Sequence, residues 1–193
     1  MSWDESYAGT PPWDIGRPQS VFAALAAAGS FSGRVLDIGC GTGEHALMAA
    51  GMGLEATGID GSTVAIGLAR KKAEARGLSA HFMVWDALDL AALAEQWDTV
   101  LDCGLFHVFS NEDRLRYVAS LRAAVAPAGR YHMLVFSDRQ PGTVGPRRIR
   151  RTEIETAFAD GWRIDSIEPA VLETTPGPGG AEAWLASILR NDN

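Results

Sequence analysis

The chain has 193 residues, of which 47% are hydrophobic and 21% are charged, and its net charge is −7. This length and composition predict one globular domain, residues 1–193, that buries a hydrophobic core. The acidic balance disfavours nucleic acid as a partner, because a nucleic-acid-binding surface requires clustered positive charge.

Two cysteines, Cys40 and Cys103, match no zinc or redox spacing, so we expect no metal and a reducing, cytoplasmic location. No hydrophobic run approaches the ~18–20 residues that span a bilayer, and no segment has a signal-peptide pattern, so we expect no membrane association. We expect a monomer or a weak homodimer.

From residue 18 onward, the hydrophobic periodicity predicts helices that alternate with buried strands. Helices are expected at about 18–28, 43–51, 62–76, 111–125 and 152–159, and strands at about 34–39, 54–59, 80–85, 98–103 and 130–137. Asn111 is expected to cap its helix. Two further strands, 163–173 and 182–189, are joined by a proline–glycine turn at 176–180, which predicts an antiparallel pair beside an otherwise parallel sheet.

Three alternating glycines follow the first predicted strand and precede a helix. Gly39, Gly41 and Gly43 allow the backbone to turn sharply and to approach a ligand, so we expect a nucleotide-type cofactor here. The dinucleotide fingerprint places its third glycine where this chain has Glu44. Asp37 and Glu44 would repel a pyrophosphate by ~1 kcal/mol or more, but they suit a cofactor that carries an ammonium and a sulfonium group.

The pattern D-x-G-x-G-x-G, from Asp37 to Gly43, resembles the glycine loop of class I S-adenosylmethionine-dependent methyltransferases. The resemblance covers nearly the whole chain and implies S-adenosyl-L-methionine as the cofactor, with Gly39, Cys40 and Gly41 beside it. It also implies an α/β, Rossmann-like fold with helices on both faces of a seven-stranded, mostly parallel sheet. The family's strand order is 3-2-1-4-5-7-6, with an antiparallel C-terminal hairpin.

Two later strands also end in an acid. Asp60 lies roughly twenty residues after the glycines, the offset at which an acid meets ribose hydroxyls. The resemblance implies that Asp60, beside Gly61, binds both hydroxyls. It also implies that Asp86 lies at the adenine amino group, with the backbone of Ala87 beside the ring. Taken singly, each aspartate is more often a turn residue or a helix cap.

Residues 1–17 form an arm that is rich in proline and aromatic side chains. We expect Trp3, Tyr7 and Trp13 to form a flap that excludes water and faces the sulfonium with aromatic rings; the alternative is an arm packed on the core. The sequence P-P-W-D-x-G-R-P, residues 11–18, resembles the thiol, halide and thiopurine methyltransferase group. This second resemblance implies a small-molecule acceptor: a thiol, a halide, or a phenolic or heterocyclic hydroxyl.

The segment after the fourth strand is expected to lie near the transferred methyl group. Cys103 and Gly104 would back the cofactor, and Phe106 and His107 would face the acceptor; the thiopurine enzymes carry an arginine in place of Cys103. His107 is the first candidate for a general base, because histidine titrates near neutral pH, and Tyr7 is the second. For His107 the alternative is a structural hydrogen bond.

Two substrate contacts beyond this segment are expected, from Trp3 and from Arg147 in the basic cluster at 147–151, whose alternative is a solvated loop. Asp98 and Asp102 are interpreted as structural. The strand-four segment lacks the Pro-Pro turn of adenine and amide methyltransferases, which disfavours those acceptors. The remaining alternatives are an RNA or protein methyltransferase, a non-catalytic S-adenosylmethionine-binding protein and, more distantly, a nicotinamide oxidoreductase.

Overall fold

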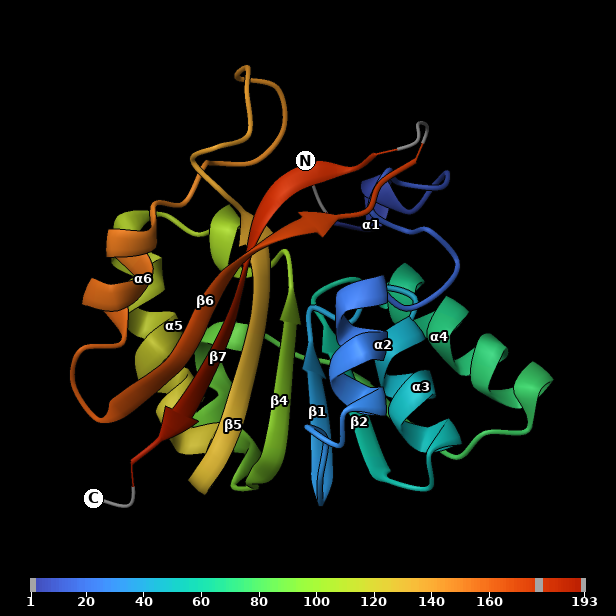
Figure 1. The fold of residues 1–193 in the computed structure, drawn as a ribbon. Coiled ribbons are helices and arrows are strands. Elements are labelled where there is room, and N and C mark those ends of the chain that lie inside the picture. The colour runs from blue at the N-terminus through green and yellow to red at the C-terminus, as the bar shows by residue number, and fades with distance from the viewer. Residues whose placement is uncertain (1–2, 176–178, 192–193) are drawn as a thin grey trace.

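The computed structural model describes residues 3–175 and 179–191, which form one sheet between two layers of helices (Figure 1). The strands are β1 (Arg34–Ile38), β2 (Glu55–Asp60), β3 (His81–Val84), β4 (Trp97–Cys103), β5 (Val125–Phe136), β6 (Trp162–Leu172) and β7 (Ala181–Arg190). Their order is β3-β2-β1-β4-β5-β7-β6, and only β7 pairs antiparallel with its neighbours. The expected strand order and hairpin are confirmed, although residues 176–178 of the predicted turn lie outside the described ranges.

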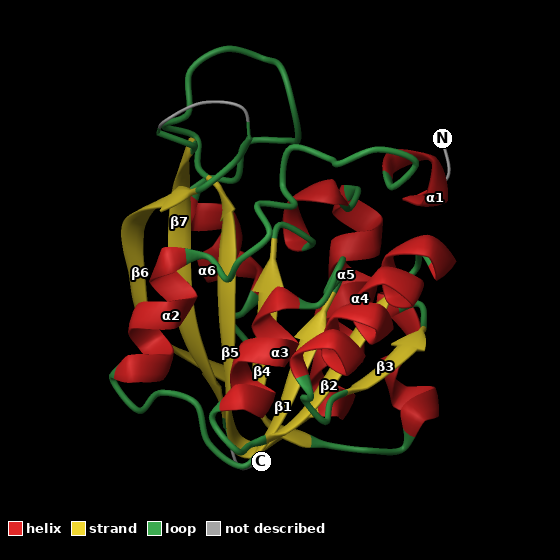
Figure 2. Ribbon diagram, turned by 90° about the vertical axis from the view of Figure 1, so that its right-hand side faces the viewer, coloured by secondary structure: helices red, strands yellow, loops and turns green. Residues whose placement is uncertain are grey.

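Helices cover both faces of the sheet, as expected (Figures 1 and 2). One face carries α2 (Ser20–Ala27), α3 (Glu44–Gly51) and α4 (Thr63–Arg76). The other carries η1 (Ala87–Leu93), α5 (Asn111–Ala124) and α6 (Arg151–Ala157). Two short elements complete the described chain, α1 (Trp3–Ser6) and the 3-10 turn η2 (Phe106–Val108). None of the helices in the described ranges is long and apolar enough to cross a membrane.

Each face of the sheet buries its own hydrophobic cluster. In β1, Val35 belongs to the cluster under α2, α3 and α4, and its neighbours Leu36 and Ile38 belong to the cluster under α5 and α6. The strand is therefore hydrophobic on both faces, as parallel strands covered by two helical layers must be.

The topology brings six strand ends to one edge of the sheet. Because β6 pairs antiparallel with β7, and β7 pairs antiparallel with β5, β6 runs in the same direction as β1 to β5. The carboxyl ends of these six strands therefore meet at the edge drawn at the top of Figure 1, where α1 and the connection from β5 to α6 also lie. This is the edge at which open α/β sheets bind ligands.

Two details differ from the sequence-based expectations. The cap of α5 is Ser110, whose hydroxyl accepts a hydrogen bond from the Asp113 amide at 3.0 Å, and not Asn111, which is the first helical residue. Strand β5 begins at Val125, earlier than expected, and its pairing with β4 shifts register between the pairs Trp97–Val125 and Thr99–Arg130, where Ala128 has a positive φ of 58°. Pro127 and Gly129 flank Ala128, and a proline and a glycine so close together are typical of a turn, so the sequence did not predict a strand here.

Candidate functional site

A cavity of about 970 Å³ lies at the carboxyl edge of the sheet, between the strand ends and the N-terminal arm. Ligand pockets measure about 300–1,000 Å³, so this cavity lies at the upper end of that range and has room for a nucleotide-type cofactor. Thirteen of the predicted site residues line it: Trp3, Tyr7, Trp13, Gly39, Cys40, Gly41, Asp60, Gly61, Asp86, Ala87, Cys103, Gly104 and His107.

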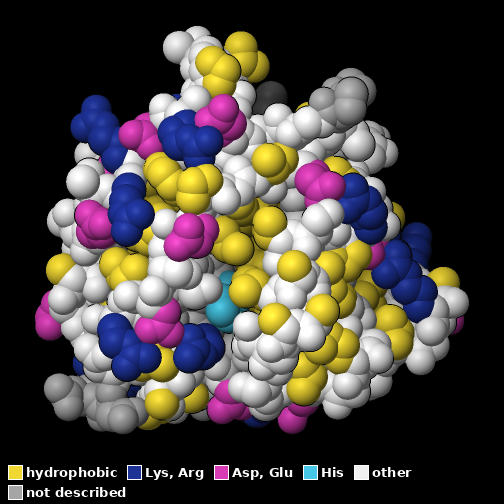
Figure 3. Space-filling model, viewed as in Figure 1, with side chains coloured by type: hydrophobic (Ala, Val, Ile, Leu, Met, Phe, Trp, Pro, Cys, Tyr) yellow, Lys and Arg dark blue, Asp and Glu magenta, His cyan; other side chains and the backbone are white. Residues whose placement is uncertain are grey.

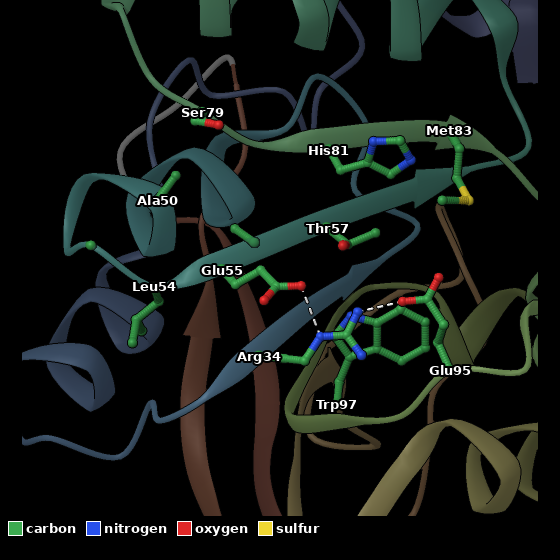
Figure 4. A pocket seen from close by; sticks show the side chains of 12 residues that line it. Arg34, Ala50, Leu54, Glu55, Thr57, Ser79, His81, Met83, Glu95 and Trp97 are labelled. Carbon is green, nitrogen blue, oxygen red and sulfur yellow. Dashed lines mark hydrogen bonds and ion pairs between the residues drawn. The ribbon is translucent and has the colours of Figure 1, made fainter.

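A second cavity, of about 590 Å³, lies at the opposite, amino edge of the strands (Figure 4). Arg34 lines this cavity together with its partners: it forms ion pairs with Glu55 and Glu95, and its guanidinium carbon lies 5.4 Å from the centre of the Trp97 ring. This arginine is already satisfied by its neighbours, and none of the predicted site residues lines this cavity. The candidate site is therefore the cavity at the carboxyl edge.

The glycine loop forms the floor of that cavity. Gly39 and Gly41 have φ values of 65° and 54°, which side chains rarely adopt. A Cβ atom at Gly41 would lie 2.8 Å from the Tyr7 hydroxyl, and one at Gly39 would lie 3.3 Å from Leu105. Both the backbone conformation and the available space therefore favour glycine where the loop meets the cavity.

Asp60 is held rigidly beside this loop. Its two carboxylate oxygens accept hydrogen bonds from the amides of Gly41 at 2.9 Å and Ser62 at 2.8 Å. Burial raises the pKa of Asp60, and these two backbone hydrogen bonds oppose that rise. A carboxylate has about four lone-pair positions, so two remain for ligand hydroxyls.

Asp86 is a helix cap, one of the two interpretations that the sequence left open, and it also lies at the cavity. One oxygen of its carboxylate accepts the Leu88 amide at 2.9 Å and caps η1, and the residue also lines the cavity.

Asp37 lies beneath the glycine loop and does not line the cavity, which corrects its expected position. It is fully buried, and one of its oxygens accepts the Ala46 amide at 3.2 Å. The other oxygen lacks a hydrogen-bond partner in the described chain, with His45 Nδ1 3.8 Å away. Burial raises the pKa of Asp37 to about 7. An unsatisfied buried carboxylate under the loop fits a positively charged ligand above it.

Three further predictions of site residues are corrected. A Cβ atom at Gly43 would lie 2.7 Å from the Phe82 ring, so this glycine allows α3 to pack on the sheet and does not face the cavity. Phe106 is fully buried in the cluster under α5. Arg147 forms an ion pair with Glu153 and lies outside the cavity lining.

The charge of Glu44 is also compensated within the protein, contrary to the expectation that it acts on the cofactor. Its carboxylate is 2.7 Å from Lys72 and 2.8 Å from Arg76. Burial raises its pKa, but the hydrogen bonds from Arg76 and Lys72 outweigh burial and keep the pKa below its usual value. Asp37 and Asp60, which have no cationic hydrogen-bond partner in the described chain, remain the acids that favour a cation.

His107 lines the cavity, but its hydrogen bonding contradicts the role of a general base. Its Nδ1 accepts a hydrogen bond from the Phe136 amide at 3.1 Å, which places the proton of the neutral ring on Nε2. Burial, reinforced by the charge of Arg148, lowers the pKa of His107 to about 4. At neutral pH this histidine therefore offers a hydrogen-bond donor and cannot accept a proton.

Tyr7 is equally unsuited to act as a base. Burial, and then the nearby Asp60 charge, raise its pKa far above the usual value, so its hydroxyl stays protonated. That oxygen accepts a hydrogen bond from the indole nitrogen of Trp13 at 3.1 Å. The Tyr7 and Trp3 rings both meet Trp13 edge to face, with centroids 6.4 and 6.5 Å apart.

Hydrogen bonds at both ends attach the arm to the core. Asp4 accepts hydrogen bonds from the Ser62 hydroxyl at 2.6 Å and the Val64 amide at 3.2 Å, at the start of α4. Arg17 binds both oxygens of Glu173 at 2.7 and 3.1 Å, beyond the end of β6. The sequence identified the aromatic side chains of the arm but not these contacts.

Much of the remaining cavity lining is hydrophobic and was largely not predicted from the sequence. The additional hydrophobic residues in this lining include Ile15, Leu105, Val108, Phe109, Phe136, Val144, Pro146 and Leu172. Two of these follow from topology, since Phe136 and Leu172 end strands whose carboxyl ends reach this edge. No group of three metal-binding side chains occurs within residues 3–175 and 179–191.

Comparisons with known proteins agree with this geometry. A family model described as "Methyltransferase domain" matches residues 35–129, which include the glycine loop, Asp60, Asp86 and His107. A 2-heptyl-1-hydroxyquinolin-4(1H)-one methyltransferase of Mycobacteroides abscessus is 36% identical over 87% of this chain and 75% of its own length. A probable thiol methyltransferase of Arabidopsis thaliana is 29% identical over 92% of this chain and 80% of its own length.

A solved structure is also similar, one that concerns the conversion of a disulfide bond into a thioacetal group during echinomycin biosynthesis. It is 38% identical and superposes with a TM-score of 0.90 over 99% of this chain and 91% of that one. The similarity therefore extends through the arm and the C-terminal hairpin as well as the glycine loop.

Proposed function

This chain belongs to the S-adenosylmethionine-dependent methyltransferases, and we propose that it methylates a small molecule on an oxygen, sulfur or halide that is already ionised when it binds. S-adenosylmethionine supplies, when bound, a methyl group on a positively charged sulfur. The protein therefore has to hold and align the reactants, and good alignment contributes ~7–11 kcal/mol to such reactions.

The residues around the glycine loop suit this cofactor. Asp60 would accept the ribose hydroxyls with its free lone pairs, and Asp86 would lie near the adenine. The backbone of Gly39 and Gly41 would lie against the cofactor where no side chain has room. Asp37 lies beneath the loop with one oxygen unsatisfied, and because its pKa is about 7, a cation above the loop would favour its charged form.

The observation that carries the proposal for the acceptor is the hydrogen bond from the Phe136 amide to His107 Nδ1. It leaves His107 with only an N–H at Nε2, and Tyr7 is also protonated, so neither predicted base can remove a proton. An acceptor that has lost its own proton needs no base. The Nε2–H group of His107 would donate a hydrogen bond to that anion and orient it toward the methyl group.

The acceptor we favour is a planar heteroaromatic molecule with an acidic hydroxyl group. Phe109, Phe136 and Leu172 give the acceptor side hydrophobic walls, two of which are planar aromatic rings. The name of the Mycobacteroides abscessus relative supports an N-hydroxylated heterocycle, and the name of the Arabidopsis thaliana relative supports a thiol. A thiol, whose usual pKa is about 8.5, also meets the requirement for ready ionisation.

The test is transfer of a tritiated methyl group at neutral pH to four acceptors: 2-heptyl-1-hydroxyquinolin-4(1H)-one, thiophenol, iodide and an unactivated phenol. We expect the hydroxyquinolone or the thiol to be methylated fastest and the phenol slowest, because a phenol with a pKa of about 10 is mostly protonated. Fastest transfer to the phenol would contradict the proposal. Binding of S-adenosylmethionine without transfer to any of the four would indicate a non-catalytic binding protein.

A further inference from the structure

Arg148 lies in the connection between β5 and α6, and its side chain binds an unusual number of backbone carbonyls. Residues 138–148 of this connection are called the acceptor loop below. The acceptor loop lies above the carboxyl edge of the sheet, with hydrophobic atoms at its tip (Figures 1 and 3). The guanidinium of Arg148 donates to five carbonyl oxygens of the loop, those of Gln140 (3.3 Å), Pro141 (3.2 Å), Gly142 (3.1 Å), Val144 (3.1 Å) and Pro146 (2.6 Å).

This set of partners distinguishes Arg148 from the arginines around it. Arg139 forms an ion pair with Glu182, and Arg151 forms one with Glu155. The hydrogen bonds of Arg148 in the described chain all go to carbonyl oxygens of its own loop. A planar guanidinium with five N–H donors is suited to gather carbonyls in this way, whereas an ammonium group is not.

Arg148 also contacts the wall of the cavity. Its guanidinium carbon lies 5.3 Å from the centre of the Phe136 ring. That ring meets His107 edge to face with centroids 5.2 Å apart, and the Phe136 amide binds His107 Nδ1. Arg148 therefore packs on Phe136, the residue whose backbone amide fixes His107 as a hydrogen-bond donor in the cavity.

The acceptor loop has little other support where it borders the cavity. Val144, Gly145 and Pro146 line the cavity, yet the side chain of Val144 is 90% exposed. The backbone hydrogen bonds in the described chain that hold the loop lie near its ends, at Asp138 and Gln140. The central residues of the loop are held mainly by the bonds to Arg148.

We propose that Arg148 is a positioning residue for the acceptor: its guanidinium folds the acceptor loop into the cavity wall and keeps the Phe136 ring against His107. This role rests on the proposed function, because it assigns the loop to the acceptor and not to the cofactor. Holding the loop requires the several N–H donors of a planar guanidinium, so a lysine, which carries the same positive charge, is insufficient.

The experiment compares the wild type with Arg148→Lys and Arg148→Ala. We expect both variants to raise the KM for 2-heptyl-1-hydroxyquinolin-4(1H)-one about tenfold or more, since several hydrogen bonds from a charged group are lost. The Kd for S-adenosylmethionine, measured by calorimetry, should stay within about twofold, and kcat should fall less than KM rises. Arg139→Lys is the matched control, because Arg139 lies in the same loop and also stacks on a ring, but that ring, Trp184, does not line the cavity and Arg139 forms an ion pair with Glu182.

Three outcomes would overturn the proposal: an unchanged acceptor KM in both variants, recovery of the wild-type KM by lysine, or a parallel rise in the Kd for the cofactor. Hydrogen exchange of the peptide 137–149 gives a readout that does not depend on activity. Faster exchange confined to this peptide in Arg148→Lys supports the loop assignment, and unchanged exchange contradicts it. A wild-type protein that methylates none of the acceptors refutes the proposed function, whereas the exchange result still decides whether Arg148 orders the loop.

Discussion

Asp60 is the residue on which cofactor binding depends most directly. Its carboxylate both fixes the glycine loop, through the Gly41 amide, and faces the cavity. Asp60→Asn keeps the shape of the side chain but removes the charge and one acceptor oxygen. We expect it to weaken S-adenosylmethionine binding by about 1.5–3 kcal/mol, the contribution of hydrogen bonds to a charged group. Calorimetric titration measures this loss; Asp89→Asn, outside the cavity lining, is the control, and an unchanged affinity in Asp60→Asn would remove Asp60 from the site.

The sequence predicts residues at strand ends well, because all carboxyl ends of parallel strands meet at one edge. The sequence does not predict which way a side chain points within a short irregular segment. Phe106 and His107 are neighbours in the single turn η2, yet Phe106 enters the core and His107 faces the cavity. Arg147 and Arg148 are also neighbours, and only tertiary contacts decide that the first binds Glu153 and the second organises the loop. The tautomer of His107 depends on an amide 29 residues away, which no local pattern reveals.

At the scale of secondary structure, the arm is the element whose attachment matters most for function. The strands and helices of the core follow from periodicity, but α1 has only four residues and depends on its contact with α4. Asp4 makes that contact from within α1, and its hydrogen bonds to Ser62, Val64 and Thr63 lower its pKa. The arm covers the cavity because this polar contact holds its first turn in place.

Asp4→Ala should release the first part of the arm and speed the dissociation of S-adenosylmethionine, while the core stays folded. Stopped-flow tryptophan fluorescence measures the dissociation rate, since Trp3 and Trp13 line the cavity. Asp113→Ala, at the start of α5 and away from the cavity, is the control. A dissociation rate equal to that of the wild type would show that the arm does not retain the cofactor through this contact.

For the whole molecule, buried histidines set the response of stability to acid. Burial lowers the pKa values of His45, His107 and His132 from 6.5 to about 4. Between these pH values the unfolded chain binds protons that the folded chain does not, so the free energy of unfolding falls as the pH falls.

Asp37 acts in the opposite direction, because its pKa of about 7 lets the folded chain keep a proton that the unfolded chain releases. Asp60 and Asp102, whose pKa values burial also raises, act in the same direction as Asp37. Glu173, whose pKa is lowered to about 2 by its hydrogen bond from Arg17, acts in the same direction as the histidines. The contribution of the histidines is therefore isolated by substituting one of them.

The histidines should therefore lower the urea midpoint as the pH falls from 6.5 to 4.5, and so steepen its slope against pH. His132→Gln should reduce that slope, because this histidine lies outside the cavity and contributes one of the three protons. An unchanged slope in His132→Gln would contradict the assignment of His132 as a neutral, buried histidine.

In the proposed mechanism the acceptor, and not the enzyme, supplies the ionised nucleophile. The most direct test is the pH dependence of kcat/KM for two acceptors of different acidity, 2-heptyl-1-hydroxyquinolin-4(1H)-one and an unactivated phenol, with wild type and His107→Gln. We predict that the midpoint of each profile follows the pKa of the acceptor and that His107→Gln lowers the rate without moving the midpoint. A single midpoint shared by both acceptors and abolished in His107→Gln would identify His107 as a base and contradict the proposed mechanism.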